Sequence, residues 1–157
     1  MKPRDPLFKT SGKIIRFYGR EFYCFSNFSS FAVDWNGRVW PTAEHAYQAA
    51  HFFGANQSLL VEKIYKSRSA YEAYKLAKAN TDKVLVRWDH VKIVIMKDIV
   101  KHKLEQNPYV MRKLIQTGKK LIVEDSPKDD FWGWGPDGNG RNELGKIWMR
   151  LREELVK

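Results

Sequence analysis

The fold of this 157-residue chain is decided in residues 33–54, which read VDWNGRVWPTAEHAYQAAHFFG. Asn36-Gly37 accepts the positive φ angles of a type I′ turn, so residues 33–39 are predicted to form a β-hairpin. Thr42 then suits the N-cap of a helix, and Glu44 is favourable near its positive end. The helix is predicted to end at Gly54. Apolar residues recur at helical spacing and predict its buried face: Ala43, Ala46, Tyr47, Ala50 and Phe53.

The same helix carries a polar stripe. Glu44, Gln48 and His51 lie at i, i+4 and i+7, so they share one face opposite the apolar one. One interpretation is an ordinary solvent-facing stripe. The other is a functional group of side chains, which is favoured by the entry through Trp40-Pro41-Thr42, because this segment holds the start of the helix rigidly.

Further elements follow on both sides. Residues 14–18 and 121–123 are predicted strands, 84–86 suit either a strand or a helix, and residues 25–30 form a loop. Helices are predicted to begin at about residues 56, 69, 88, 108 and 142, with the fourth ending at Gly118. The predicted inward positions of the third and fifth of these helices are Val91, Ile95, Ile99 and Leu104, and Leu144, Ile147, Trp148, Leu151 and Leu155. Residues 1–12 are predicted to be a flexible arm, and residues 13–157 a single domain.

Composition limits the class of protein. Hydrophobic residues make up 43% and charged residues 29%, which argues against a disordered chain. Cys24 stands alone, so an intramolecular disulfide and a cysteine-based zinc site are excluded. No apolar run approaches the roughly 18 residues of a membrane span, and Met1 is not followed by a signal-peptide pattern. We therefore expect no membrane partner and a cytoplasmic location.

The net charge is +10, and residues 62–120 hold fifteen Lys and Arg against six Asp and Glu. This basic segment suits an anionic partner, either a phosphorylated small molecule or nucleic acid. The alternative is a set of solvated helix faces. Charge alone does not choose between them.

The segment from Asp129 to Gly145 is rich in glycine and aromatic residues. Its glycines allow close backbone approach to a ligand, and the segment leads directly into a predicted helix at Asn142, where an anion is favoured. It matches neither a Walker loop nor a dinucleotide fingerprint. A flexible connector is the alternative, but Trp132 and Trp134 argue against it, since large exposed aromatics are rarely kept without a contact.

Four blocks together resemble the NADAR, or YbiA-like, family, in the family's order over about residues 14–155. They are Phe25-Ser26-Asn27-Phe28, Trp40-Pro41-Thr42-Ala43-Glu44-His45-Ala46-Tyr47-Gln48-Ala49, Trp88 with Met96, and Asp130–Gly133 with Gly140–Gly145. The resemblance implies an α+β fold, a helix-rich single domain with a small antiparallel sheet. It also implies hydrolysis at an anomeric carbon. Family members are known as N-glycosidases that act on ribosylamino-pyrimidine phosphates, the early intermediates of riboflavin synthesis, and others remove ADP-ribose from guanine in nucleic acid.

Breaking an N-glycosidic bond passes through a positively charged, oxocarbenium-like sugar, which a carboxylate stabilises while it orients or deprotonates water. We assign Glu44 and Asp130 as the catalytic carboxylates and leave open which of them activates water. Trp132 is the expected stacking platform for the base. Asn27, Gln48 and Asn142 are expected to position the substrate. The expected phosphate-binding residues are Gly133, Gly135 and Gly140, with Arg16 and Arg141. No cofactor and no metal are expected, because the four histidines form no convincing ligand set.

One departure from the family pattern is His51, which stands where the family often has Lys. If that Lys contacts phosphate, His51 would be a weaker, pH-dependent substitute. The leading hypothesis is an N-glycosidase for a ribosylamino-pyrimidine phosphate. The alternatives are an ADP-ribose glycohydrolase acting on guanine in nucleic acid, and a non-catalytic binder of ADP-ribose or nucleotides.

Overall fold

A computed structural model describes residues 13–54 and 56–157. The predicted arm at residues 1–12 lies outside the described residues. The chain divides into two compact units: residues 27–107 form one, and the segment up to Ser26 joins Pro108–Lys157 in the other. The boundaries of the predicted domain, 13–157, stay a prediction.

The unit of residues 27–107 begins with the predicted hairpin. Strand β2 (Val33–Trp35) pairs antiparallel with β3 (Arg38–Trp40). Asn36 and Gly37 have φ angles of 52° and 83°, so both turn residues are left-handed, as the Asn-Gly pair predicted. The antiparallel pair expected for this fold is therefore confirmed.

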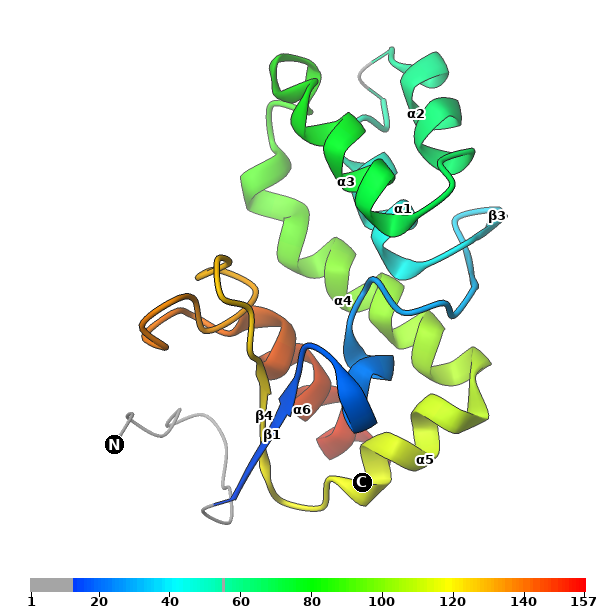
Figure 1. The fold of residues 1–157 in the computed structure, drawn as a ribbon. Helices are drawn as coiled ribbons and strands as arrows, with labels where there is room; N and C mark the ends of the chain where they lie inside the picture. The colour runs from blue at the N-terminus through cyan, green and yellow to red at the C-terminus, as the bar shows by residue number, and fades with distance from the viewer. Residues whose placement is uncertain (1–12, 55) are drawn as a thin grey trace. The chain divides into compact units, whose positions relative to one another are not determined.

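Helix α1 (Ala43–Ala50) is the centre of this unit. The backbone N–H of His45 donates to Oγ1 of Thr42 over 3.2 Å, so the predicted N-cap is confirmed. Every residue of α1 is buried, because α1 packs against α2 (Ser58–Tyr65), α3 (Ala70–Lys78) and α4 (Trp88–Gln106) (Figure 1). The solvent-facing interpretation of the polar stripe is wrong, and Glu44 and Gln48 lie in the interior.

The remaining segments of this unit are helical or irregular. A short 3₁₀ helix, η2 (Thr81–Lys83), follows α3, and residues 84–86 form neither strand nor helix. On α4 the predicted inward residues Ile99 and Leu104 are buried, whereas Val91 and Ile95 are only half-buried. The buried face instead includes Met96, Val100 and Lys103, because α4 packs against α1 and β2 together.

The second unit contains the two other predicted strands. Strand β1 (Ile14–Phe17) pairs with β4 (Leu121–Glu124), and the pair is parallel, with Ile14 opposite Leu121. Both strands were predicted from the sequence, but their pairing was not. Helix α6 (Glu143–Leu155) packs against β4 (Figure 1). The 3₁₀ helix η1 (Arg20–Phe25) lies beside β1 and beside α5 (Pro108–Gln116).

The core of this second unit contains an aromatic cluster. The rings of Phe25 and Trp148 lie 4.8 Å apart, and Nε1 of Trp148 donates to the carbonyl of Phe25 over 3.0 Å. Phe17 packs edge-on against Phe25. The predicted inward residues of α6 are buried except Leu155, which is 42% exposed in the last helical turn. The prediction for Leu155 is wrong, because this residue is the last of α6, where the helix ends.

Helices long and apolar enough to cross a membrane are absent from residues 13–54 and 56–157.

Candidate active site

Glu44 lies in the first turn of α1, and its side chain is only 6% exposed. One turn later, Nε2 of Gln48 donates to Oε1 of Glu44 over 2.6 Å. The backbone N–H of Glu44 donates to the carbonyl of Asn27 over 3.1 Å. The structure thus brings together three of the predicted site residues, and it holds a buried carboxylate in a fixed orientation.

The side chain of Asn27 is 6% exposed and lies against α4, with Nδ2 3.2 Å from Sδ of Met96. Its Oδ1 is buried and has no hydrogen-bond partner among the residues that the structure describes. An unpaired buried amide oxygen costs free energy, and such groups are uncommon except where a ligand or water satisfies them. The amide oxygen of Asn27 is therefore suited to accept a hydrogen bond from a ligand.

His45 holds the beginning of α1 in place. Its Nδ1 lies 2.8 Å from Oγ1 of Thr42, and its Nε2 lies 3.0 Å from the carbonyl of Ser67, to which it donates. Burial lowers the pKa of His45 below its ordinary value, and the bond to Ser67 opposes this only in part. A neutral His45 therefore links the N-terminus of α1 to the segment after α2.

His51 ends α1 and lies in an aromatic cluster. Its ring centroid is 3.9 Å from that of Trp88 and 4.9 Å from that of Tyr47. Burial lowers the pKa of His51 to about 4, nearby Lys92 adds to this, and bonds to backbone carbonyls oppose it. His51 is therefore neutral near pH 7. A neutral ring supplies no positive charge to a phosphate at this pH, and contact of His51 with phosphate stays a prediction.

The glycine-rich segment of the other unit is an ordered loop. Oδ1 of Asp129 accepts the backbone N–H groups of Phe131 and Trp132 over 2.9 and 2.8 Å. The carbonyl of Asp130 accepts the N–H of Arg141 over 2.7 Å. The side chain of Asp130 is exposed, and Trp132 is half-buried. Asp129 was not among the site residues predicted from the sequence, although an Asp two residues before a backbone N–H is compatible with an Asx turn.

The glycines of this loop are required by the packing of the loop on itself. A Cβ on Gly140 would lie 2.6 Å from the carbonyl oxygen of Gly133, and a Cβ on Gly133 would lie 2.7 Å from that of Glu124. Gly135 has a φ of +70°, and a Cβ there would lie 2.8 Å from Cβ of Asp130. Whether these three glycines also contact a substrate phosphate stays a prediction.

Backbone N–H groups at the start of α6 are hydrogen-bonded to the glycine-rich loop. The N–H groups of Glu143 and Leu144 donate to the carbonyls of Phe131 and Trp132, each over 3.0 Å. The expectation that this helix start offers free N–H groups to an anion is wrong for these two residues.

Asn142 precedes α6 in a left-handed conformation with φ 54°, and its side chain makes no cap. Its Oδ1 accepts the N–H of Glu124, and its Nδ2 donates to the carbonyl of Ile122, both over 2.9 Å. Both ends of the amide are thus bonded to β4. The contact of Asn142 with a substrate stays a prediction.

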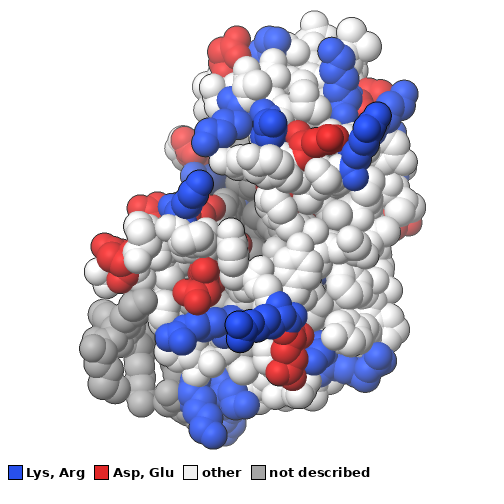
Figure 2. All heavy atoms as spheres, in the orientation of Figure 1, with Lys and Arg blue, Asp and Glu red and all other residues white. Residues whose placement is uncertain are grey.

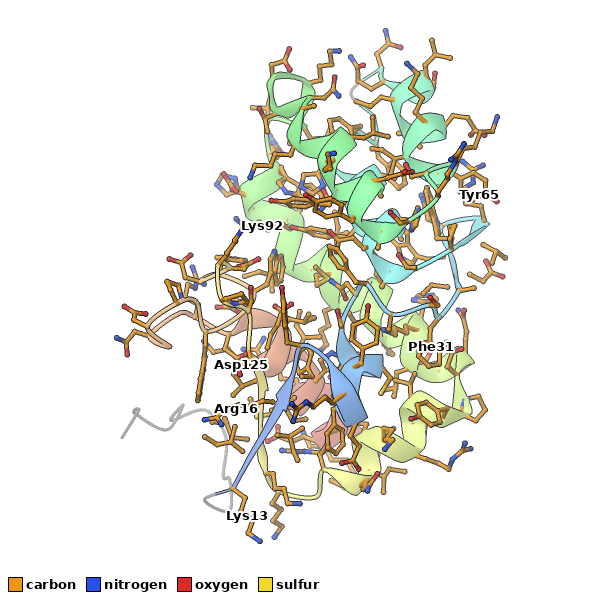
Figure 3. The ribbon with its side chains drawn as sticks, in the orientation of Figure 1. Lys13, Arg16, Phe31, Tyr65, Lys92 and Asp125 are labelled. Atoms are coloured by element: carbon orange, nitrogen blue, oxygen red, sulfur yellow. The ribbon has the colours of Figure 1, made fainter. Side chains whose placement is uncertain are left out.

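The two predicted phosphate-binding arginines, Arg16 and Arg141, differ in the contacts of their side chains. Arg141 donates through Nε and Nη2 to Oε1 of Glu143 over 3.0 and 2.8 Å, and its guanidinium lies 4.7 Å from the ring centroid of Phe131. Arg16 is exposed on β1 (Figure 3). Glu143 therefore holds one guanidinium in place, and Arg16 faces solvent.

The predicted residues fall into two groups, one in each unit. Asn27, Glu44 and Gln48 belong to the unit of residues 27–107, and the others belong to the second unit. Tyr47 and Trp88, whose rings pack against His51, were not among the site residues predicted from the sequence. Among residues 13–54 and 56–157, no three His, Cys, Asp or Glu side chains are placed to hold a metal.

Residues 16–156 match the model of the NADAR domain. The chain is 38% identical over 132 residues to the N-glycosidase Npun_R5314 of Nostoc punctiforme, covering 84% of this chain and 85% of that protein. It is 38% identical over 130 residues to the riboflavin biosynthesis protein VVA0006 of Vibrio vulnificus, covering 83% of this chain but only 35% of that longer protein.

A solved structure is similar over both units. The NMR structure of the Escherichia coli protein YbiA aligns with a TM-score of 0.84 and 30% identity, over 97% of this chain and 90% of that one. The α+β fold expected from the sequence is thereby confirmed. The chain belongs to the NADAR domain family, which includes proteins named N-glycosidases, hydrolases that act on N-glycosyl compounds.

Proposed function

We propose that this protein hydrolyses the N-glycosidic bond between ribose and base in a ribosylamino-pyrimidine phosphate. The observation that carries the proposal is the buried carboxylate of Glu44, whose Oε1 accepts a hydrogen bond from Nε2 of Gln48 over 2.6 Å, while the backbone N–H of Glu44 donates to the carbonyl of Asn27. Relatives named riboflavin biosynthesis proteins in Vibrio vulnificus and Zea mays support this class of substrate.

In the proposed reaction, water attacks the anomeric carbon as the bond from that carbon to nitrogen breaks. The bonding electron pair goes to the nitrogen of the base, which takes a proton from solvent as it leaves; a carboxylate receives one proton of the attacking water and returns it to solvent after the reaction. Glu44 is suited to stabilise the oxocarbenium-like sugar. A carboxylate that is fixed and shielded from bulk water attracts a developing positive charge more strongly than one in water does. Gln48 is the positioning residue that fixes Oε1 of Glu44.

We propose Asp130 and Trp132 of the glycine-rich loop as further site residues. The carboxylate of Asp130 is exposed, so it can receive a proton from water. Trp132, half-buried beside Phe131 at 4.8 Å between ring centroids, offers an aromatic surface for the base. Arg16 is the proposed phosphate contact, since its side chain is exposed and cationic.

Product analysis tests the proposal. The protein is incubated with a ribosylamino-pyrimidine phosphate, and the mixture is analysed by mass spectrometry for the free base and ribose phosphate. Both products should form with the wild-type protein and should be strongly reduced with Glu44→Gln. Failure of the wild-type protein to release a base from this substrate would refute the proposal.

The two alternatives, an ADP-ribose glycohydrolase acting on guanine in nucleic acid and a non-catalytic binder of ADP-ribose, are tested by incubating the protein with an ADP-ribosylated oligonucleotide and with free ADP-ribose. Release of guanine-containing nucleic acid and ADP-ribose would support the first, and binding without products would support the second. The structure offers less charge for nucleic acid than the sequence suggested, because Lys103 is fully buried. On the face shown in Figure 2, Lys and Arg side chains are interspersed with Asp and Glu.

A further inference from the structure

His51 is locked in one tautomer by the end of its own helix. Its Nδ1 lies 3.0 Å from the carbonyl oxygen of Tyr47 and 3.2 Å from that of Gln48. Carbonyl oxygens only accept, so Nδ1 must carry the proton when the ring is neutral. Nε2 then holds a lone pair and acts only as an acceptor.

The ring of His51 is also fixed in orientation. Trp88 lies against it at 3.9 Å between centroids with an interplanar angle of 31°, and Tyr47 packs edge-on at 77°. The Nδ1 bonds prevent the ring from turning over. Nε2 makes no hydrogen bond within residues 13–54 and 56–157, and the ring is half-buried.

The position of His51 relates it to the proposed carboxylate. Glu44, Gln48 and His51 lie on one face of α1 and its C-terminal end. Gln48 contacts both of the others: its side chain donates to Glu44, and its backbone carbonyl lies 3.2 Å from Nδ1 of His51. A rigid, neutral acceptor on the same helix face as a proposed catalytic carboxylate is suited to recognise a donor group on a substrate.

We infer that Nε2 of His51 accepts a hydrogen bond from an N–H or O–H group of the substrate, and so helps to select that substrate. This inference rests on the proposed function. A fully ionised phosphate has no donor, so the assignment places phosphate elsewhere. The donor belongs either to the base, as a ring or exocyclic N–H, or to the sugar, as a hydroxyl.

Two substitutions separate binding from structure. His51→Asn keeps a donor near Nδ1 for the carbonyls of Tyr47 and Gln48 but has no group at the Nε2 position. His51→Gln keeps an acceptor near Nε2 but loses the Nδ1 contacts. His90, exposed on α4, provides the control variant His90→Asn.

The experiment measures KM and kcat for the ribosylamino-pyrimidine phosphate, together with inhibition by each product alone, the free aminopyrimidine and ribose 5-phosphate. Losing a hydrogen bond between neutral groups should raise KM about three- to tenfold in His51→Asn and change kcat less. KM should stay near the wild-type value in His51→Gln and His90→Asn. Weaker inhibition of His51→Asn by the aminopyrimidine places the donor on the base, and weaker inhibition by ribose 5-phosphate places it on the sugar.

The inference is overturned if His51→Asn keeps the wild-type KM, or if His51→Gln loses more than His51→Asn, since the ring then only anchors the helix end. A His51→Lys variant that binds ribose 5-phosphate more tightly than wild type would also overturn it, by making the position a phosphate contact. If the wild-type protein turns over no substrate, the proposed function fails, and direct binding of the two products by calorimetry still tests His51.

Discussion

Nζ of Lys103 donates a hydrogen bond to Oγ of Ser29 over 2.9 Å, and both side chains are almost completely buried, at 0% and 1% exposure. The ammonium group also lies 5.5 Å from the ring centroid of Phe31 (Figure 3 labels Phe31). Ser29 lies two residues after Asn27. This pair therefore ties α4 to the loop that carries a proposed substrate-binding amide.

Lys103→Ala should lower the free energy of unfolding by about 2–4 kcal/mol, because it leaves a cavity in the core and removes the donor to Ser29. Lys103→Met should recover most of this loss, since it refills the space without a buried charge. Urea denaturation of the three proteins measures both effects. Equal losses in the two variants would mean that the polar contacts, rather than packing, stabilise this region.

Glu44→Gln should leave the fold intact and reduce turnover by roughly 10²–10⁴, because the amide keeps the size of the carboxylate but not its charge. Gln48→Met should reduce turnover by a smaller factor, since Glu44 keeps its charge and loses only a positioning contact. Circular dichroism checks the fold, and product release checks turnover. Turnover of Glu44→Gln close to the wild-type value would leave Glu44 with a purely structural role.

Gly140→Ala should destabilise the glycine-rich loop by about 2–4 kcal/mol, because the new Cβ would lie 2.6 Å from the carbonyl oxygen of Gly133. Gly19→Ala is the matched control, since Gly19 has extended backbone and the methyl group that alanine adds would have nothing within 4 Å among the described residues. Thermal unfolding compares the two. A Gly140→Ala protein with wild-type stability but weaker substrate binding would instead support direct contact of this glycine with phosphate.

The two histidines of α1 predict sensitivity to acid. Burial lowers the pKa of His45, and that of His51 falls to about 4, so both folded-state values lie below the unfolded value of about 6.5. Their contribution to stability is therefore fully present above about pH 6.5 and is lost as the pH falls towards 4. Unfolding free energies measured between pH 8 and pH 4 should decline over this range.

In His51→Gln, which does not titrate at this position, the decline should be shallower than in the wild-type protein. An identical pH dependence in the two proteins would show that His51 does not contribute to it.

Lysines of residues 62–120 test the nucleic-acid alternative. Lys75, Lys78 and Lys101 are exposed, whereas Lys103 is buried, so a variant with only the three exposed lysines changed to Gln preserves the core. If the substrate is a nucleic acid, removing each lysine that neutralises a phosphate should reduce the salt slope by about 0.7–0.9. Oligonucleotide titrations at several salt concentrations measure this slope. Undetectable binding at low salt would leave the small metabolite as substrate.

Local patterns in the sequence were sufficient for several elements. Asn36-Gly37 determined the hairpin, because few residue pairs adopt two positive φ angles, and Thr42 determined the start of α1 through its cap. The strands at β1 and β4 were also recognisable from their apolar runs. The family resemblance added the fold class and the residues of the proposed site.

Only the tertiary structure decided which faces are buried and which polar groups meet. Helical spacing placed Glu44 and Gln48 on a polar stripe, yet α2, α3 and α4 pack around α1 and bury that stripe. Lys103 likewise looked like a solvated lysine, and it is buried because Ser29, distant in sequence, supplies its partner. Periodicity describes one helix at a time, whereas burial depends on neighbours from remote parts of the chain, which also pair β1 with β4 in parallel.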